Sequence, residues 1–112
     1  MKKIEAIVRP ERVSIVRRAL EDVGCPGITI TDVRGHGAQK GSVQHYRGTE
    51  FVMDILHKVK LELVVAEDAV EKIIKVISEN ARTGAVGDGK IFVSTIDEVV
   101  RVRTGESGPA AI

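Results

Sequence analysis

Residues 84–90 (GAVGDGK) combine three glycines with a lysine, a combination suited to holding a phosphate group. Glycines allow successive backbone N–H groups to converge on an anion, and the lysine adds a positive charge. The segment fits the start of the Walker A motif, but Ile91 stands where that motif needs serine or threonine to bind magnesium. We also expect a helix before the segment and a strand after it, which reverses the order of a P-loop. The segment therefore predicts an anion site rather than a P-loop NTPase or a plain turn, which would need fewer glycines.

Two arginines, Arg101 and Arg103, stand two residues apart near the C-terminus. On a strand, residues i and i+2 project to the same face, so both guanidinium groups could grip a phosphate through paired hydrogen bonds. Alone, such a pair is more often a solvated strand edge. Together with residues 84–90, it supports a phosphate site.

A second glycine segment, residues 35–41 (GHGAQKG), misses the dinucleotide-binding fingerprint because Lys40 replaces its third glycine. Its glycines still permit close approach of a ligand, and the amide oxygen of Gln39 could coordinate a hard cation such as Mg²⁺. Spacing alone favours an exposed loop amide for Gln39. The three histidines, 36, 45 and 57, lack metal-ligand spacing, and no nucleophile–base or paired-acid pattern is present. The sequence therefore predicts a binding protein and not an enzyme.

The sequence predicts two similar strand–helix–strand halves, which would position these segments. Alternating apolar residues predict strands over 3–8 and 59–65, and a β-branched run predicts another over 28–31. A fourth strand is expected over 91–96 and a short fifth over 99–103. Helical spacing predicts one helix opening at Pro10 and ending before Gly24, and a second over 70–81 that Asp68 and Glu71 would begin as a capping box. Residues 35–57 show no sustained period and are expected to form a long loop. The order predicts an α+β, ferredoxin-like (βαβ-βαβ) fold in a single domain over residues 1–112.

The bulk properties narrow the class of protein. The net charge of +1 and the 3% aromatic content argue against a nucleic-acid partner. No apolar run is long enough to span a membrane, the N-terminus is no signal peptide, and the lone Cys25 fits a reducing cytosol, so a cytoplasmic protein is expected. Ile7 and Val64 should face away from the helices. Either they are tolerated surface residues or, as we favour, they lie in a homo-oligomer interface.

These features together resemble the PII signal-transduction family, the trimeric sensors of nitrogen status. The likeness extends over essentially the whole chain. It rests on the opening MKKIEAIVRP, on residues 35–41, on residues 46–50 (YRGTE), and on three C-terminal stretches, TG at 83–84, GDGKIFV at 87–93 and RVRTGE at 101–106. The chain looks most like the branch that regulates ammonium transporters.

The resemblance implies a homotrimer that binds ATP or ADP between subunits, with Mg²⁺ and 2-oxoglutarate as further ligands. By position, the nucleotide would be bound by Ile7, Thr29, Gly35, Gly37, Ala38, Gln39, Glu62, Val64, Gly87, Asp88, Gly89, Lys90, Arg101 and Arg103. Gln39 would ligate Mg²⁺ and contact 2-oxoglutarate, whose distal carboxylate would pair with Lys58. Tyr46 and Arg47 would lie in a partner-binding T-loop, approximately residues 37–55, that recognises an ammonium transporter. Nitrogen-assimilation enzymes such as glutamine synthetase are further expected partners, and the protein would reach the membrane only through a transporter.

Three positions depart from the family pattern. Phe51 replaces the tyrosine that is uridylylated in some members, so that modification cannot occur there, although Tyr46 and Thr49 keep hydroxyl groups. Ala38 replaces a frequent arginine and removes one possible phosphate contact. His57 replaces a frequent proline beside Lys58, which predicts a looser loop hinge and less secure binding of 2-oxoglutarate than of ATP.

The expected mechanism is a ligand-gated change of loop shape, since Gln39 and Lys58 stand at the two ends of the 35–57 segment. ADP lacks the γ-phosphate and could not assemble the same Mg²⁺ site. One alternative is a ferredoxin-like phosphotransfer enzyme, for which His36 is the only histidine inside a glycine segment. Another is an RNA-binding module, which the scarcity of stacking aromatics disfavours.

Overall fold

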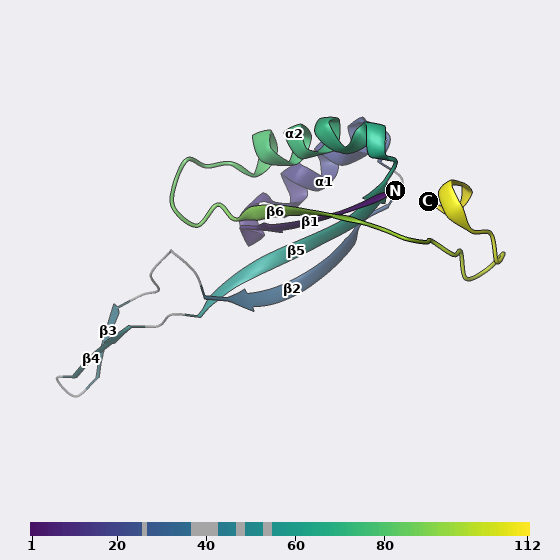
Figure 1. Cartoon of the computed structure of the whole chain (residues 1–112). Helices are drawn as coiled ribbons and strands as arrows, with labels where there is room; N and C mark the ends of the chain where they lie inside the picture. Colours follow the sequence, from purple (N-terminus) through teal and green to yellow (C-terminus); the bar gives the residue numbers. More distant parts are fainter. Residues whose placement is uncertain (26, 37–42, 47–48, 53–54) are drawn as a thin grey trace.

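The chain forms a four-stranded antiparallel sheet with both helices on one face, and a separate two-stranded hairpin (Figure 1). The computed structural model describes residues 1–25, 27–36, 43–46, 49–52 and 55–112. In chain order its elements are β1 (Lys2–Val8), the 3₁₀ turn η1 (Pro10–Arg12), α1 (Val13–Asp22), β2 (Thr29–Gly35), β3 (Val43–Tyr46), β4 (Thr49–Val52), β5 (Leu56–Val65), the 3₁₀ turn η2 (Glu67–Ala69), α2 (Val70–Ala81), β6 (Lys90–Thr95) and the 3₁₀ turn η3 (Gly108–Ala111).

The sheet interleaves the two halves of the chain. Its strand order is β2-β5-β1-β6, with β1 hydrogen-bonded to β5 on one side and to β6 on the other. The pairing of Ile4 with Leu63 and of Ile4 with Val93 fixes the two registers of β1. This order, with two helices on one face, confirms the ferredoxin-like fold expected from the sequence.

The core lies between the helices and the sheet. Alternate residues of β1 and β5 point to the helices, and both helices present an apolar stripe to the sheet. Pro10 opens η1 at its first position and leads directly into α1, as expected from its fixed φ. The buried residues are Ile4, Ala6, Val8, Val16, Leu20, Val59, Leu61, Leu63, Val65, Ile73, Ile77 and Ala81.

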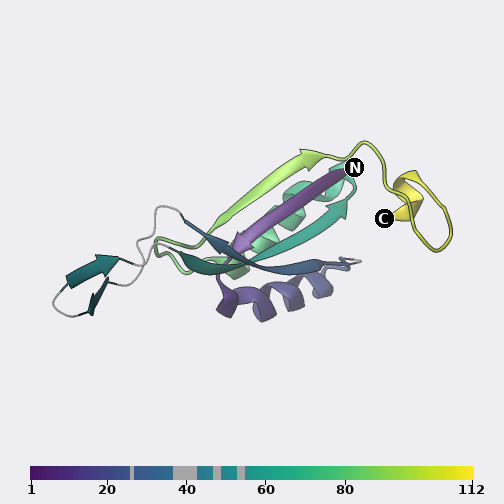
Figure 2. The ribbon, with the colours of Figure 1, turned by 90° about the horizontal axis from the view of Figure 1, so that it is seen from below.

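The other face of the sheet is open in the single chain, where no described helix or strand covers it (Figure 2). Ile7 and Val64 lie on this face, as predicted, and both are partly exposed. Phe92, which pairs with Glu5, shares the face and is 53% exposed. The charged residues Lys3, Glu5, Lys60 and Glu62 occupy the positions between these apolar ones and form a connected set of ion pairs. The face is therefore mixed and not uniformly apolar.

The expected fifth strand over 99–103 is wrong. Only an isolated bridge joins Val100 to Ser107, and the chain between them turns back on itself. The amide of Arg101 donates to the carbonyl of Glu106 and the amide of Gly105 donates to that of Arg101, both at 2.8 Å. Gly105 has a φ of +73°, which allows this tight turn. Arg101 and Arg103 therefore do not share the face of a strand.

Two other expectations about local structure are also wrong. Residues 35–57 are not one loop, because β2 extends to Gly35, β5 begins at Leu56, and β3 pairs with β4 from Val43↔Val52 to Tyr46↔Thr49. No capping box opens α2, because the N-cap positions of η2 and α2 are Ala66 and Ala69, whose side chains form no capping hydrogen bond. The single turn η2 leads into the helix instead.

Candidate functional site

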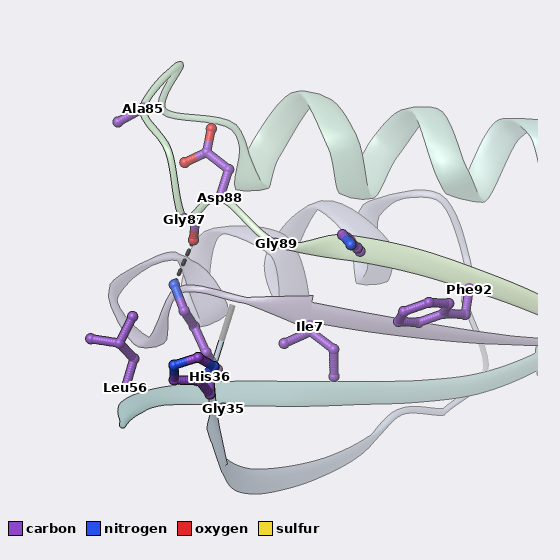
Figure 3. A pocket seen from close by; sticks show the side chains of 11 residues that line it. Ile7, Gly35, His36, Leu56, Ala85, Gly87, Asp88, Gly89 and Phe92 are labelled. Carbon is purple, nitrogen blue, oxygen red and sulfur yellow. Dashed lines mark hydrogen bonds between the residues drawn. The ribbon is translucent and has the colours of Figure 1, made fainter. Parts of the chain in front are cut away.

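A cavity of about 480 Å³ lies where the ends of β1, β2 and β5 meet the connection between α2 and β6 (Figure 3). Both glycine segments reach it, through Gly35 on one side and through Gly87 and Gly89 on the other. The cavity thus joins segments about 50 residues apart in the chain, as the sheet order requires. The residues that line it are Ile7, Gly35, His36, Leu56, Lys58, Ala85, Gly87, Asp88, Gly89, Lys90 and Phe92.

The 84–90 segment adopts a backbone that side-chain-bearing residues rarely accept. Gly84, Gly87 and Gly89 have φ values of +90°, +102° and +104°. At Gly89 an added Cβ would lie 1.7 Å from the carbonyl oxygen of Ile7, so the segment passes in direct contact with the end of β1. Glycine is therefore required at Gly89 both by its φ and by this close approach.

The carboxylate of Asp88 organises the bend of this segment. Its Oδ2 accepts hydrogen bonds from the backbone amides of Thr83 and Gly84, each at 2.9 Å, and its Oδ1 accepts one from the hydroxyl of Thr83. Figure 3 shows the carboxylate within the bend of its own segment. The hydroxyl of Thr83 and the guanidinium of Arg9 lower the pKa of Asp88 well below its usual range, so the group is an anion at neutral pH.

Arg9, which the sequence reasoning missed, anchors the same bend from the end of β1. Its Nε donates to Oδ1 of Asp88 at 3.0 Å and its Nη2 donates to the carbonyl of Val86 at 2.8 Å. Only 15% of its side chain is exposed. No local motif marks this residue, because its partners lie 77 and 79 positions away in the chain.

Lysines supply positive charge to the cavity. Lys58, on β5, donates a 2.5 Å hydrogen bond from Nζ to the carbonyl of Gly87, which a dashed line marks in Figure 3. Lys90 lines the wall at the start of β6, and His36 lies beside the end of β2. Because the carboxylate of Asp88 is already neutralised by Arg9 and by backbone donors, the lysines give the cavity the character of an anion site.

Of the 13 predicted site residues that the structure describes, seven line the cavity. Ile7, Gly35, Lys58, Gly87, Asp88, Gly89 and Lys90 all line the cavity. Thr29, Glu62 and Val64 do not line it. Thr29 pairs with Glu62 across β2 and β5, nearer the other end of those strands. Gly37, Ala38, Gln39 and Arg47 lie outside the described residues, and Tyr46 belongs to β3.

Arg101 and Arg103 lie apart from the cavity in this single chain. The chain leaves β6 and runs to the end of the sheet opposite the 84–90 segment, where the C-terminal turn lies (Figures 1 and 2). There Nη1 of Arg101 pairs with Glu106 at 3.1 Å, and its Nη2 donates to the carbonyl of Ala110 at 3.2 Å. The expected juxtaposition of these arginines with the glycines therefore does not occur within one copy of the chain.

Glu62 has a different setting from the cavity residues. It lies between Lys3 and Lys60, with each Nζ 3.4 Å from its Oε1. Partial desolvation would raise its pKa, but the hydrogen bonds and charges of Lys60 and Lys3 outweigh that effect and lower the pKa. Glu62 is thus an ionised member of the charged set on the open face.

Two negative findings apply to the part of the chain that the structure describes. Within it, no group of three or more histidine, cysteine, aspartate or glutamate side chains could hold a metal ion. None of its helices is both long enough and apolar enough to cross a membrane.

Phe92 lines the cavity and was also missed by the sequence reasoning. It stands two residues after Lys90 on β6, so the two side chains share one face of the strand. That spacing was a usable signal, since Lys90 was already a predicted site residue. Leu56 and Ala85 add apolar surface to the same cavity.

Comparisons with known proteins agree on one family. The family model described as nitrogen regulatory protein P-II matches residues 1–106. The chain is 54% identical over 112 residues to nitrogen regulatory protein P-II of Bradyrhizobium diazoefficiens, covering 100% of both. It is 51% identical to nitrogen regulatory protein P-II 2 of Methanothermobacter thermautotrophicus, covering 100% of this chain and 97% of that protein. The crystal structure of Arabidopsis thaliana PII bound to citrate superposes with a TM-score of 0.81, at 46% identity, covering 99% of this chain and 91% of that one.

Proposed function

The chain belongs to the P-II family of nitrogen regulatory proteins, and we propose that it senses cellular nitrogen and energy status by binding ATP or ADP in the cavity at the 84–90 segment. The family and these relatives are named as regulators, so the chain is a regulatory protein and not an enzyme. The phosphotransfer alternative accordingly has no support. We take residues 1–112 to act as one domain.

The observation that carries this proposal is the meeting of both glycine segments at one cationic cavity. A cavity of about 480 Å³ is large enough for a nucleotide, and small-molecule sites commonly combine an apolar wall with a few placed polar groups. Ile7, Leu56 and Phe92 supply the apolar wall. Lys58, Lys90 and the backbone of Gly87 and Gly89 supply the polar side, which suits phosphates.

Magnesium and 2-oxoglutarate complete the proposal. The carboxylate of Asp88 is occupied by Arg9, Thr83 and Gly84, so we assign Mg²⁺ to Gln39 and the nucleotide phosphates rather than to Asp88. Lys58 would exchange the carbonyl of Gly87 for the distal carboxylate of 2-oxoglutarate. A related plant protein has been crystallised with citrate, another small carboxylate, which supports a carboxylate ligand in this family.

A homotrimer would supply the remaining predicted contacts. Arg101 and Arg103 lie at the opposite end of their own sheet, so a neighbouring copy is the natural source of arginines for each cavity. The same holds for Thr29, Glu62 and Val64, which do not line the cavity of their own chain. Ile7, Val64 and Phe92 on the open face are partly exposed in the single chain and would be covered by this assembly.

The partner side of the proposal concerns residues 37–55, which we take as the T-loop. We assign this chain to the branch that regulates ammonium transporters, with Tyr46 and Arg47 as the contact residues and glutamine synthetase as a further target. Ligands at Gln39 and Lys58 would change the loop shape and so shift its affinity for such a partner. The protein would be cytoplasmic and reach the membrane only through the transporter.

Calorimetric titration tests the proposal directly. ATP and ADP are titrated with and without Mg²⁺ and 2-oxoglutarate, and we expect 2-oxoglutarate to bind only when ATP and Mg²⁺ are present. The Lys58→Ala variant should not bind 2-oxoglutarate. The Lys75→Ala variant, changed on the exposed face of α2, should bind 2-oxoglutarate with wild-type affinity. Absence of nucleotide binding by the wild type would refute the proposal. Unchanged binding of 2-oxoglutarate by Lys58→Ala would refute the role given to Lys58.

A further inference from the structure

Two arginines of the β1–α1 junction hold different parts of the α2–β6 connection. Arg12 donates from Nε and Nη2 to the carbonyl of Asn80, at 3.0 and 2.7 Å, at the end of α2. Arg9 acts further along, on Asp88 and Val86. The two side chains are only three residues apart, yet only Arg9 contacts the residues between the glycines.

The contacts of Arg9 and Asp88 together span the bend. Asp88 holds the start of the segment through the amides of Thr83 and Gly84, and the hydroxyl of Thr83 in turn accepts the amide of Ala85 at 3.2 Å. Arg9 then joins Asp88 to Val86 across the bend. Three glycines would otherwise leave this segment with large conformational freedom.

Arg9 is itself fixed in place. Its carbonyl accepts the amide of Arg12 at 3.0 Å, in the turn that Pro10 opens, and its side chain is mostly covered. A guanidinium group can make two directed hydrogen bonds from one planar group, which a lysine cannot do. The bend is therefore tied to the end of β1, the same strand end that Gly89 touches at Ile7.

We propose that Arg9 is a positioning residue for the nucleotide site: through Asp88 and Val86 it holds the 84–90 segment ready to receive phosphate before any ligand arrives. The role assigned to Arg9 is exerted through these two residues and includes no contact with the phosphate. It lowers the ordering cost of binding, because the segment is already in its binding shape. This inference rests on the proposed nucleotide site.

Three variants separate positioning from a general effect on stability. Arg9→Lys keeps the charge but loses the two-bond geometry, Arg9→Gln loses both, and Arg12→Gln is the matched control that loosens the end of α2 without touching the bend. ATP affinity is measured by calorimetry at a temperature where all variants are folded, as checked by circular dichroism. Amide hydrogen exchange of residues 83–89 is measured without ligand.

We expect Arg9→Gln to weaken ATP binding at least tenfold and Arg9→Lys to weaken it by a smaller factor, since charge-assisted hydrogen bonds are lost. Exchange at 83–89 should rise in both, while the central strands keep wild-type protection. Arg12→Gln should lower the melting temperature but leave ATP affinity unchanged. The double change Arg9→Gln and Asp88→Asn should weaken ATP binding by less than the product of the two single effects, because both changes break one network.

Wild-type ATP affinity and wild-type exchange in Arg9→Gln would overturn the inference. Equal weakening of ATP binding by Arg12→Gln would also overturn it, since the effect would then follow general destabilisation. If the wild type itself binds no ATP, the proposed function is refuted, and so is the role of Arg9 in ATP binding. The exchange data in that case still decide whether Arg9 orders the segment.

Discussion

At the scale of single residues, Gly89 is the position where backbone conformation and crowding coincide. Its φ is +104°, and a Cβ there would meet the carbonyl oxygen of Ile7. Gly84 shares a positive φ but has open space around it, and Gly35 has neither constraint. Substitutions at Gly89, Gly84 and Gly35 therefore separate the cost of backbone strain from the cost of steric overlap.

We predict that Gly89→Ala lowers the free energy of unfolding by about 3 kcal/mol or more, because left-handed strain and overlap with backbone add together. Gly84→Ala should cost about 1 kcal/mol through strain alone. Gly35→Ala should change stability by less than about 0.5 kcal/mol. Urea denaturation measures all three, and equal effects at the three positions would contradict this account.

Asp88 predicts a pH dependence of stability. Its pKa is lower in the folded chain than in the unfolded one, so ionised Asp88 stabilises the fold above its ordinary value near pH 4. That contribution is lost progressively as the pH falls below about 4 towards the folded-state pKa. Acid therefore removes from the wild type a stabilisation that the Asp88→Asn variant already lacks.

We expect Asp88→Asn to melt at a lower temperature than the wild type at pH 7, with a difference that narrows steadily below about pH 4. Asp97→Asn, at an exposed aspartate after β6, serves as the control and should melt close to the wild type throughout. Thermal unfolding followed from pH 7 to pH 3 provides the measurement. A gap between wild type and Asp88→Asn that stays constant over this range would argue against the predicted shift.

At the scale of elements, the two helices are held to the sheet by a narrow apolar stripe. Leu20 of α1 is fully buried, whereas Ile15 of the same helix is 44% exposed. We predict that Leu20→Ala lowers the free energy of unfolding by about 3 kcal/mol, through lost burial and the cavity left behind. Ile15→Ala also replaces an aliphatic side chain of α1 with alanine, but at an exposed position, and should lower the free energy of unfolding by less than about 1 kcal/mol. Comparable losses at the two positions in denaturant titrations would mean that the stripe is assigned wrongly.

Strands with strict alternation could be predicted from the sequence, because their side-chain period determines which face is buried. The faces of β1 and β5 were predicted correctly for this reason, including the outward direction of Ile7 and Val64. The strand predicted over 99–103 does not form, because the turn through Gly105 and the ion pair of Arg101 with Glu106 outweigh strand propensity. A local sequence pattern does not show which of two competing local structures, here a strand and a turn, is the more stable.

The hairpin and Arg9 show two other limits. β3 and β4 are four residues each, which is too short for a side-chain period to emerge from the sequence. The glycines and Lys90 were predicted because they form one contiguous motif. Arg9 was not, because its role depends on Asp88, which only the fold brings within 3.0 Å.

At the scale of the whole molecule, assembly is the main prediction. A trimer should give a mass near three times the 12.1 kDa of one chain in light scattering after size-exclusion chromatography. Val64→Glu places a charge on the open face and should shift the mass towards that of a single chain, because burying an unpaired carboxylate is unfavourable. Lys72→Glu, at an exposed position of α2, is the control and should leave the mass unchanged. A wild type that elutes as a single chain would refute the trimer.

The position of β1 between β5 and β6 also sets the order in which the chain can fold during synthesis. β1 leaves the ribosome before β5 and β6, yet its partners are residues 59–65 on one side and 90–95 on the other. β2 likewise pairs with β5 and not with its neighbour in sequence. The first half therefore cannot build its part of the sheet until β5 has emerged, and such distant pairings make sheet formation slow. A nascent chain stalled before β5 should consequently be protease-sensitive, and the two halves should not fold when expressed apart.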